Sequence, residues 1–205
     1  NRIKINYSIT YRRSKKEIEK LDREKLNIMA EGTKEMHFEE HVVKYLTKVA
    51  QPEFSEYTEK DNSCYDKELC LIPEDVIGFI KDSQPEKYQA LYDHQYGEST
   101  DRKLLELVSS TISKSKQKTL QVFREKVKDR GQYFDLIYFT PLHDKTPEHQ
   151  EAYLKNRLTV IRQLKYSKKN EKSIDIVLFI NGLPVITIEL KNALTGQYLH
   201  HAIKQ

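Results

Sequence analysis

The chain has 205 residues, with 35 Lys and Arg against 31 Asp and Glu, giving a formal net charge of +4. Hydrophobic residues make up 38% and charged residues 32%, which excludes a fibrous or disordered chain and predicts a globular protein that buries a core. No apolar run approaches the ~20 residues of a membrane helix. Because 2 cysteines form no disulfide framework, we expect a cytoplasmic protein without membrane contact.

The first half of the chain is predicted to be mainly helical. Residues 1–11 alternate between apolar and polar side chains, as in a strand, and residues 14–30 fit a solvated helix. An amphipathic helix is expected over 35–49, a loop over 50–70, and further helices from Pro73, from Pro85 to Tyr96 and over 104–112. The apolar stripe of the 35–49 helix is formed by Phe38, Val42, Tyr45, Leu46 and Val49.

The second half of the chain changes to a strand pattern. We expect strands over 119–127, 133–139, 158–166, 174–180 and 184–191, a short helix over 147–154 and a last helix from 196. This order of elements predicts an α/β or α+β fold with a mixed central sheet flanked by helices.

Positive charge is unevenly distributed along this chain. Residues 114–130 carry seven basic and two acidic side chains, and residues 162–172 carry five and one. Such patches suit a polyanion such as DNA, although solvated lysine faces produce the same pattern.

Three charged residues stand out in the last two predicted strands. Glu189 and Lys191 are two residues apart and share one strand face, and Asp175 interrupts an apolar strand. If Asn181-Gly182-Leu183 forms a three-residue loop, Asp175 lies opposite Glu189, whereas a two-residue turn places them on different faces. We predict the longer loop. Two carboxylates beside a lysine then suit Mg²⁺ and phosphate chemistry, with a surface salt bridge as the alternative.

The segment from Ser173 to Asn192 (SIDIVLFINGLPVITIELKN) resembles the nuclease motif of the restriction (R) subunit of type I restriction-modification enzymes. The stretches 71–75, 79–85 and 156–166 agree with the same family. The resemblance covers roughly 35–205, so residues 1–34 are expected to form an extension outside the nuclease domain.

This resemblance implies a restriction-endonuclease-like PD-(D/E)xK domain that cuts double-stranded DNA with Mg²⁺, for which Mn²⁺ can substitute. By position, Asp175 and Glu189 would be metal ligands and Lys191 the catalytic lysine. Glu39 matches the helical glutamate of the family, and Gln205 matches the glutamine of its Gln-x-x-x-Tyr motif. Glu39 shares a helix side with Val43 and Leu46.

The family also implies partners and further domains. Methylation and specificity subunits would complete the complex, and ATP would act only in downstream motor domains, before which we expect this chain to end. The chain itself contains no Gly-x-x-x-x-Gly-Lys-Ser/Thr sequence, so we expect no P-loop in it.

Other residues offer weaker hypotheses. Phosphate contacts are expected from basic side chains of the two patches, namely Arg124, Lys126, Lys128, Arg162, Lys165 and Lys168. Gln163 and Tyr166 are either phosphate contacts or ordinary strand and loop residues. One alternative function is an inactive module of the same fold that binds DNA or a subunit. A zinc peptidase through His37, Glu40 and His41 is a less favoured alternative, because Glu40 pairs outward with Lys44 on a solvated helix face.

Overall fold

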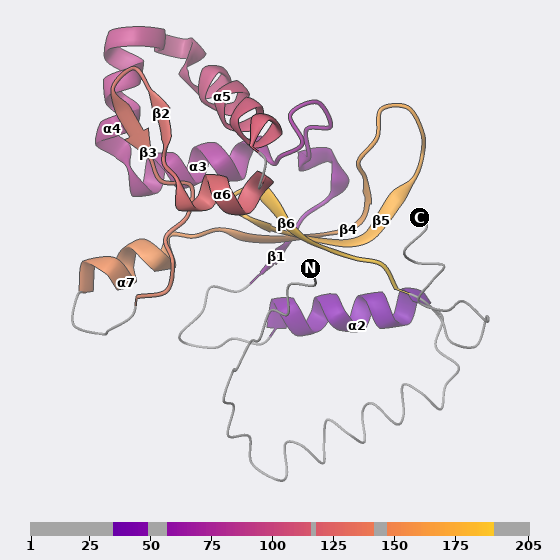
Figure 1. Cartoon of the computed structure of the whole chain (residues 1–205). Coiled ribbons are helices and arrows are strands. Elements are labelled where there is room, and N and C mark those ends of the chain that lie inside the picture. The colour runs from indigo at the N-terminus through magenta and orange to yellow at the C-terminus, as the bar shows by residue number, and fades with distance from the viewer. Residues whose placement is uncertain (1–34, 49–56, 116–117, 142–146, 191–205) are drawn as a thin grey trace.

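A computed structural model describes residues 35–48, 57–115, 118–141 and 147–190 of the chain (Figure 1). The predicted strand over 1–11 and the predicted helices over 14–30 and from 196 lie outside these residues. Lys191 and Gln205 also lie outside them, as does the proposed domain boundary at 34/35.

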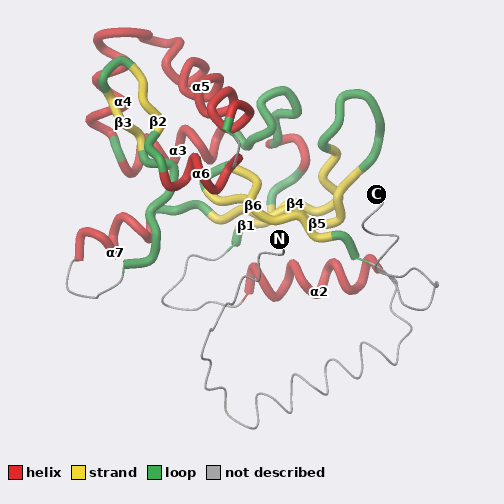
Figure 2. Tube along the Cα trace, in the orientation of Figure 1, coloured by secondary structure: helices red, strands yellow, loops and turns green. Residues whose placement is uncertain are grey.

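A four-stranded sheet in the order β1-β4-β5-β6 forms the centre of the described structure (Figure 2). Its strands are β1 (Thr58–Glu59), β4 (Leu158–Lys165), β5 (Ser173–Ile180) and β6 (Leu183–Ile188). β1 is parallel to β4, and the other two pairs are antiparallel, so the sheet is mixed, as predicted. A separate hairpin joins β2 (Val127–Asp129) to β3 (Gln132–Phe134).

Helices lie on both sides of this sheet (Figure 1). They are α2 (Glu35–Lys48), α3 (Pro73–Ser83), α4 (Pro85–Leu91), α5 (Thr100–Lys114), α6 (Lys118–Arg124) and α7 (Pro147–Leu154). Proline occupies the first turn of α3 and of α4, where its missing N–H costs nothing. The predicted helices from Pro73, over 104–112 and over 147–154 are therefore confirmed. Among the described residues, no helix combines the length and apolar character that a membrane span requires.

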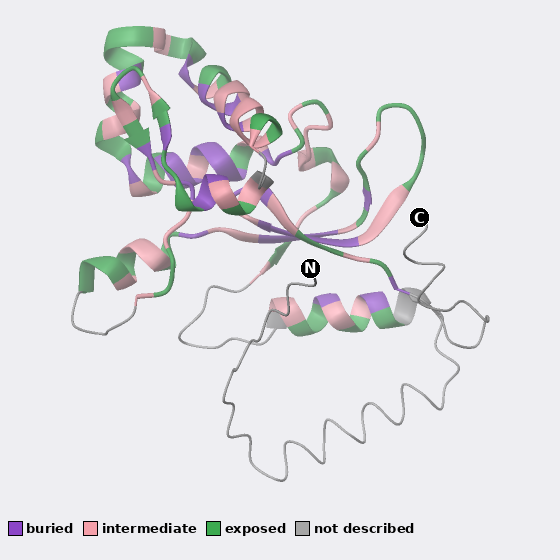
Figure 3. Ribbon diagram, viewed as in Figure 1, coloured by how far each residue is buried: buried purple, intermediate pink, exposed green. Residues whose placement is uncertain are grey.

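Both faces of the sheet are covered by apolar side chains. Ile176 and Leu178 pack with Val43 of α2, whereas Val177 and Phe179 pack with Ile72 on the other face. Residues 176–179 of β5 are all buried, which explains their continuous apolar run, and Figure 3 shows the buried strands between the two layers.

The apolar stripe that the sequence predicted for α2 is partly wrong. Phe38 and Tyr45 are 45% and 43% exposed, whereas Val43 is 2% exposed. The face toward the sheet is centred on Val43 and includes Glu39, one turn earlier, which is only 6% exposed. The helix therefore buries the Glu39 carboxylate on the side of Val43, where the sequence placed it.

The predicted strand over 119–127 is also wrong, because its first part is helix α6. Val122 and Phe123 are adjacent in sequence and both buried, while Leu120 is exposed, so the pattern does not follow the alternation of a strand. The predicted strand over 133–139 is reduced to β3, which ends at Phe134. The predicted 50–70 loop contains the short strand β1.

The hairpin between β5 and β6 has a two-residue turn, so the predicted three-residue loop is wrong. Ile180 pairs with Leu183 across Asn181 and Gly182, whose φ angles of 50° and 79° fit the mirror-image turn that Asn-Gly favours. An irregularity then shifts the register between Leu178 and Phe179. Beyond this irregularity Ile176 pairs with Ile188. The same register would place Asp175 opposite Glu189, which is the pairing that we expected. The bulge thus restores the register that the shorter turn removes.

Candidate active site

A cavity of about 790 Å³ lies between α2 and the sheet, where β4 leads into the β4–β5 loop. The described residues that line it are Glu39, Glu59, Lys60, Asp61, Asn62, Arg162, Gln163 and Asp175. They come from α2, from β1 and the segment that follows it, from β4 and from β5, so the cavity exists only in the folded chain.

Two carboxylates meet at one amide on the cavity wall. Nε2 of Gln163 donates to Oε2 of Glu39 at 2.7 Å and to Oδ1 of Asp175 at 3.1 Å. Oε1 of Gln163 accepts a hydrogen bond from the Ser173 hydroxyl at 2.8 Å. Glu39 and Asp175, 136 positions apart in the sequence, therefore converge on a single nitrogen atom.

The second oxygen of Asp175 holds the segment that follows β6. Oδ2 accepts a hydrogen bond from the backbone amide of Leu190 at 2.6 Å. The peptide that joins Glu189 to Leu190 therefore lies against the Asp175 carboxylate. The Glu189 side chain is exposed, and it is not among the described residues that line the cavity.

Arg162, expected to contact phosphate, pairs with acidic side chains at the cavity. Its Nε donates to Oε1 of Glu59 at 2.6 Å and lies 4.0 Å from Oε1 of Glu39. The Arg162 side chain is 38% exposed and thus remains reachable from solvent. Its charge offsets part of the negative charge that the cavity carboxylates bring together.

Two other predicted DNA contacts follow Arg162 along the chain: Lys165 is the last residue of β4, and Lys168 lies on the β4–β5 loop. Lys165 pairs with Glu171 at 2.8 Å, and Lys168 pairs with Glu68 at 3.2 Å. Both lysine side chains are more than half exposed. Exposed pairs of this kind are weak, so both ammonium groups are available to a polyanion.

The remaining predicted DNA contacts are Arg124 at the end of α6, Lys126 in the connection that follows it and Lys128 on β2, and none of them lines the cavity. Lys126 pairs with Asp135 at 3.1 Å, and the Lys128 ammonium lies 5.2 Å from the centre of the Tyr133 ring. The two basic patches of the sequence therefore lie on different elements of the structure.

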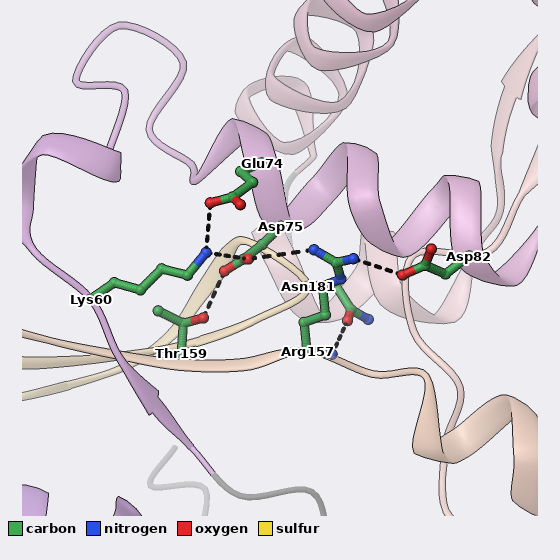
Figure 4. A network of polar contacts seen from close by, with 7 residues as sticks. All are labelled: Lys60, Glu74, Asp75, Asp82, Arg157, Thr159 and Asn181. Atoms are coloured by element: carbon green, nitrogen blue, oxygen red, sulfur yellow. Dashed lines mark hydrogen bonds and ion pairs between the residues drawn. The ribbon is translucent and has the colours of Figure 1, made fainter.

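A second polar network lies behind the cavity and joins α3 to the sheet (Figure 4). Asp75 is 2% exposed, accepts from the Thr159 hydroxyl at 2.6 Å and pairs with Lys60 at 2.8 Å. Glu74 binds the same ammonium at 2.8 Å, and Arg157 reaches across to Asp82. Because Lys60 also lines the cavity, this network fixes one of the cavity walls.

The charges of this network shift the pKa values of its members. Burial lowers the pKa of Lys60, but hydrogen bonds and charge attraction from Asp75 and Glu74 outweigh burial and raise it above its ordinary value. The hydrogen bond and charge of Lys60 lower the pKa of Glu74. At the cavity rim, hydrogen bonds from Ser63 lower the pKa of Asp61.

The residues of the zinc hypothesis lie on the outer side of α2. His41 is exposed, and the Glu40 carboxylate forms an ion pair with Lys44, as expected. The side chain of His37 lies outside the described residues. Within the described ranges, no three His, Cys, Asp or Glu side chains form a group that could hold a metal ion.

Sequence reasoning did not identify the link that Gln163 forms between Glu39 and Asp175. It placed Gln163 only beside a basic stretch, because a glutamine in an alternating strand carries no signal of its own. Lys60 and Asn62 were missed as well, since the two-residue strand that positions them is too short to show periodicity.

The fold and the site together define a class of protein. An α+β domain with a mixed four-stranded sheet is consistent with a restriction-endonuclease-like domain. Residues 8–205 match the family described as the type I restriction enzyme R protein N terminus (HSDR_N). The chain therefore belongs to this family. Comparisons with curated proteins and with solved structures found no match.

Proposed function

We propose that this chain is the cytoplasmic, Mg²⁺-dependent nuclease domain of a type I restriction enzyme R protein and cleaves double-stranded DNA. The observation that carries the proposal is the convergence of Glu39 and Asp175 on Gln163 in the wall of an open cavity. Carboxylates that converge in this way are costly unless a cation or hydrogen-bond donors offset their repulsion.

The residues present fit a hard divalent cation. Carboxylate oxygens are the ligands that Mg²⁺ prefers, and the two acids of the cluster supply them from α2 and β5. In our proposal Asp175 and Glu39 hold the ion, and Lys191 stabilises charge that develops on the phosphate. Glu189 joins them as a metal ligand only through the family motif, because its exposed side chain is not among the described residues that line the cavity. The cation itself would supply Lewis acidity and a bound water of lowered pKa. Gln205 would belong to the same site through the family motif.

DNA would approach along the cavity mouth and the β4–β5 loop. Arg162, Lys165 and Lys168 lie along this path, so their charges would contact phosphates beside the carboxylates. Arg124, Lys126 and Lys128 would contact DNA only if the duplex extended to α6 and β2. In the complete enzyme the partners would be the methylation and specificity subunits, and ATP would be used by motor domains outside this chain.

The test is plasmid cleavage by the complete R protein, assembled with its methylation and specificity subunits and supplied with ATP and Mg²⁺. Asp175→Asn should reduce cleavage by more than about 100-fold, since it removes a ligand charge from the centre of the site. The matched control is Asp93→Asn, because Asp93 is exposed and bonds only to Gln89 among the described contacts. Thermal unfolding of the chain should show both variants folded.

Two results would distinguish a nuclease domain from a binding module of the same fold. Loss of cleavage with retained DNA binding in Asp175→Asn would support the nuclease. Cleavage by Asp175→Asn at the rate of the unchanged protein would overturn it, and the chain would then be a DNA- or subunit-binding module of the same fold.

A further inference from the structure

Gln163 has a backbone conformation that is unusual inside a strand. Its φ is 48°, in the left-handed region, where side chains other than glycine are strained. The pairing of β4 with β5 passes from Arg162 with Ile176 directly to Leu164 with Ile174. Gln163 and Asp175 therefore face each other at an interruption of the ladder.

The interruption changes which side chains reach the cavity. Arg162 and Gln163 are consecutive, yet both line it, whereas Ile161 and Leu164 both pack into the apolar cluster on the other face of the sheet. A regular strand would send Arg162 and Gln163 to opposite faces. The left-handed residue thus brings the amide to the side on which Glu39 lies.

Hydrogen bonds hold both the oxygen and the nitrogen of the Gln163 side-chain amide. Its oxygen accepts from Ser173, so its NH₂ group is directed to the carboxylates, and both N–H bonds are used there. A neutral double donor offsets the repulsion between two carboxylates without adding a positive charge that would compete with a cation.

We propose that Gln163 is a positioning residue, which holds Glu39 and Asp175 at one point so that a divalent cation meets a preformed pair of carboxylates. This inference rests on the proposed function. Strained backbone at a site is retained where the geometry it creates is used, and partners that orient metal ligands commonly control affinity for the metal.

The test measures Mn²⁺ binding to the complete chain by electron paramagnetic resonance in three variants at Gln163 and Ser173, with Asp175→Asn as the reference for loss of a ligand. Gln163→Met keeps the length of the side chain but removes its hydrogen bonds, and Gln163→Gly removes the amide while relieving the left-handed strain. Both should raise the Mn²⁺ dissociation constant by about 10-fold or more. Ser173→Ala, which frees the amide to rotate, should raise it less.

Stability separates positioning from a structural role. Gln163→Gly should be at least as stable as Gln163→Met, because glycine adopts a positive φ without strain. If Mn²⁺ affinity falls equally in both variants while their stabilities differ, the amide acts on the carboxylates and the effect does not come from folding. In the complete enzyme, raised Mg²⁺ should restore the cleavage rate of Gln163→Met.

Two outcomes would overturn the inference, and they are distinguishable. Mn²⁺ binding that is lost in Asp175→Asn but unchanged in Gln163→Met would overturn this inference alone. No Mn²⁺ binding by the unchanged chain would overturn the proposed metal site and the inference with it.

Discussion

The side chain of Asn181 donates a hydrogen bond from Nδ2 to Oδ1 of Asn156 at 2.8 Å, and both amides are buried. Nδ2 of Asn181 also donates to the carbonyl of Leu136, and Oδ1 accepts from the amide of Arg157. The tip of the β5–β6 hairpin is thus fixed to the start of β4 and to the segment after β3. This contact holds in place the strands that carry Asp175 and Gln163.

Asn181→Asp should lower the free energy of unfolding by about 2–4 kcal/mol, because it replaces a buried donor by a carboxylate facing two carbonyl oxygens. Aspartate tolerates the left-handed turn, so the loss reports the hydrogen bonds and not the backbone. Urea unfolding measures it. The control is Asn170→Asp: Asn170 is exposed and its Oδ1 accepts from the Lys172 amide, so the change should stay within about 0.5 kcal/mol. Equal losses in both variants would contradict this prediction.

Gly182→Ala should be more destabilising than Gly131→Ala, although both glycines have positive φ, of 79° and 84°. A Cβ at Gly182 would lie 2.5 Å from the carbonyl oxygen of Ile72, whereas a Cβ at Gly131 meets nothing within 4 Å. Gly131→Ala should cost about 1–2 kcal/mol from backbone strain alone. Overpacking should add roughly 1–3 kcal/mol at Gly182, as chemical denaturation would show. Equal costs would mean that the Ile72 segment moves aside freely.

The contribution of Lys60 to stability should disappear in alkaline solution. The pKa of Lys60 is raised in the folded state, so its stabilising effect is fully present below the pKa of the unfolded chain, about 10.4. It is lost as the pH rises through the higher folded value. The unfolding free energy of Lys60→Met should therefore lie below that of the unchanged protein at pH 8, and the gap should narrow above pH ~10.5.

The comparison variant for this pH series is Lys103→Met. Lys103 is about half exposed, and its ion pair with Glu106 is long, at 3.5 Å. The unfolding free energy of Lys103→Met should therefore equal that of the unchanged protein at every pH. If the difference in unfolding free energy between Lys60→Met and the unchanged protein stays constant up to pH 11, the charge of Lys60 does not contribute to stability.

Lys165→Gln combined with Lys168→Gln should weaken binding to duplex DNA and lower the salt dependence of that binding. If each lysine contacts one phosphate, the slope of log K against log salt concentration should fall by about 0.9 per residue. Fluorescence anisotropy at several salt concentrations measures both quantities. The control replaces Lys103 and Lys114, which are exposed on α5, by glutamine. A matching loss in the control would show that only net charge matters.

The hairpin shows how far sequence reasoning reached and where it failed. The apolar runs of β5 and β6 predicted both strands, because side-chain periodicity is local. The loop was predicted with three residues and has two, and the bulge that compensates for this difference left no mark in the sequence. The expected register was therefore derived from an incorrect turn. Asn-Gly favours the two-residue turn locally, and a Cβ at Gly182 would meet the carbonyl oxygen of Ile72, so the folded chain also requires glycine there.

The sequence alone determined the mixed α+β class, most helices, and the type I R protein family, because periodicity, prolines and a long motif are properties of neighbouring residues. It also suggested Glu39 as a residue of the buried side of its helix. The tertiary structure decided that Glu39 and Asp175 meet at Gln163. That meeting depends on one left-handed residue inside a strand, a conformation with a local cost that only long-range contacts in the folded chain offset.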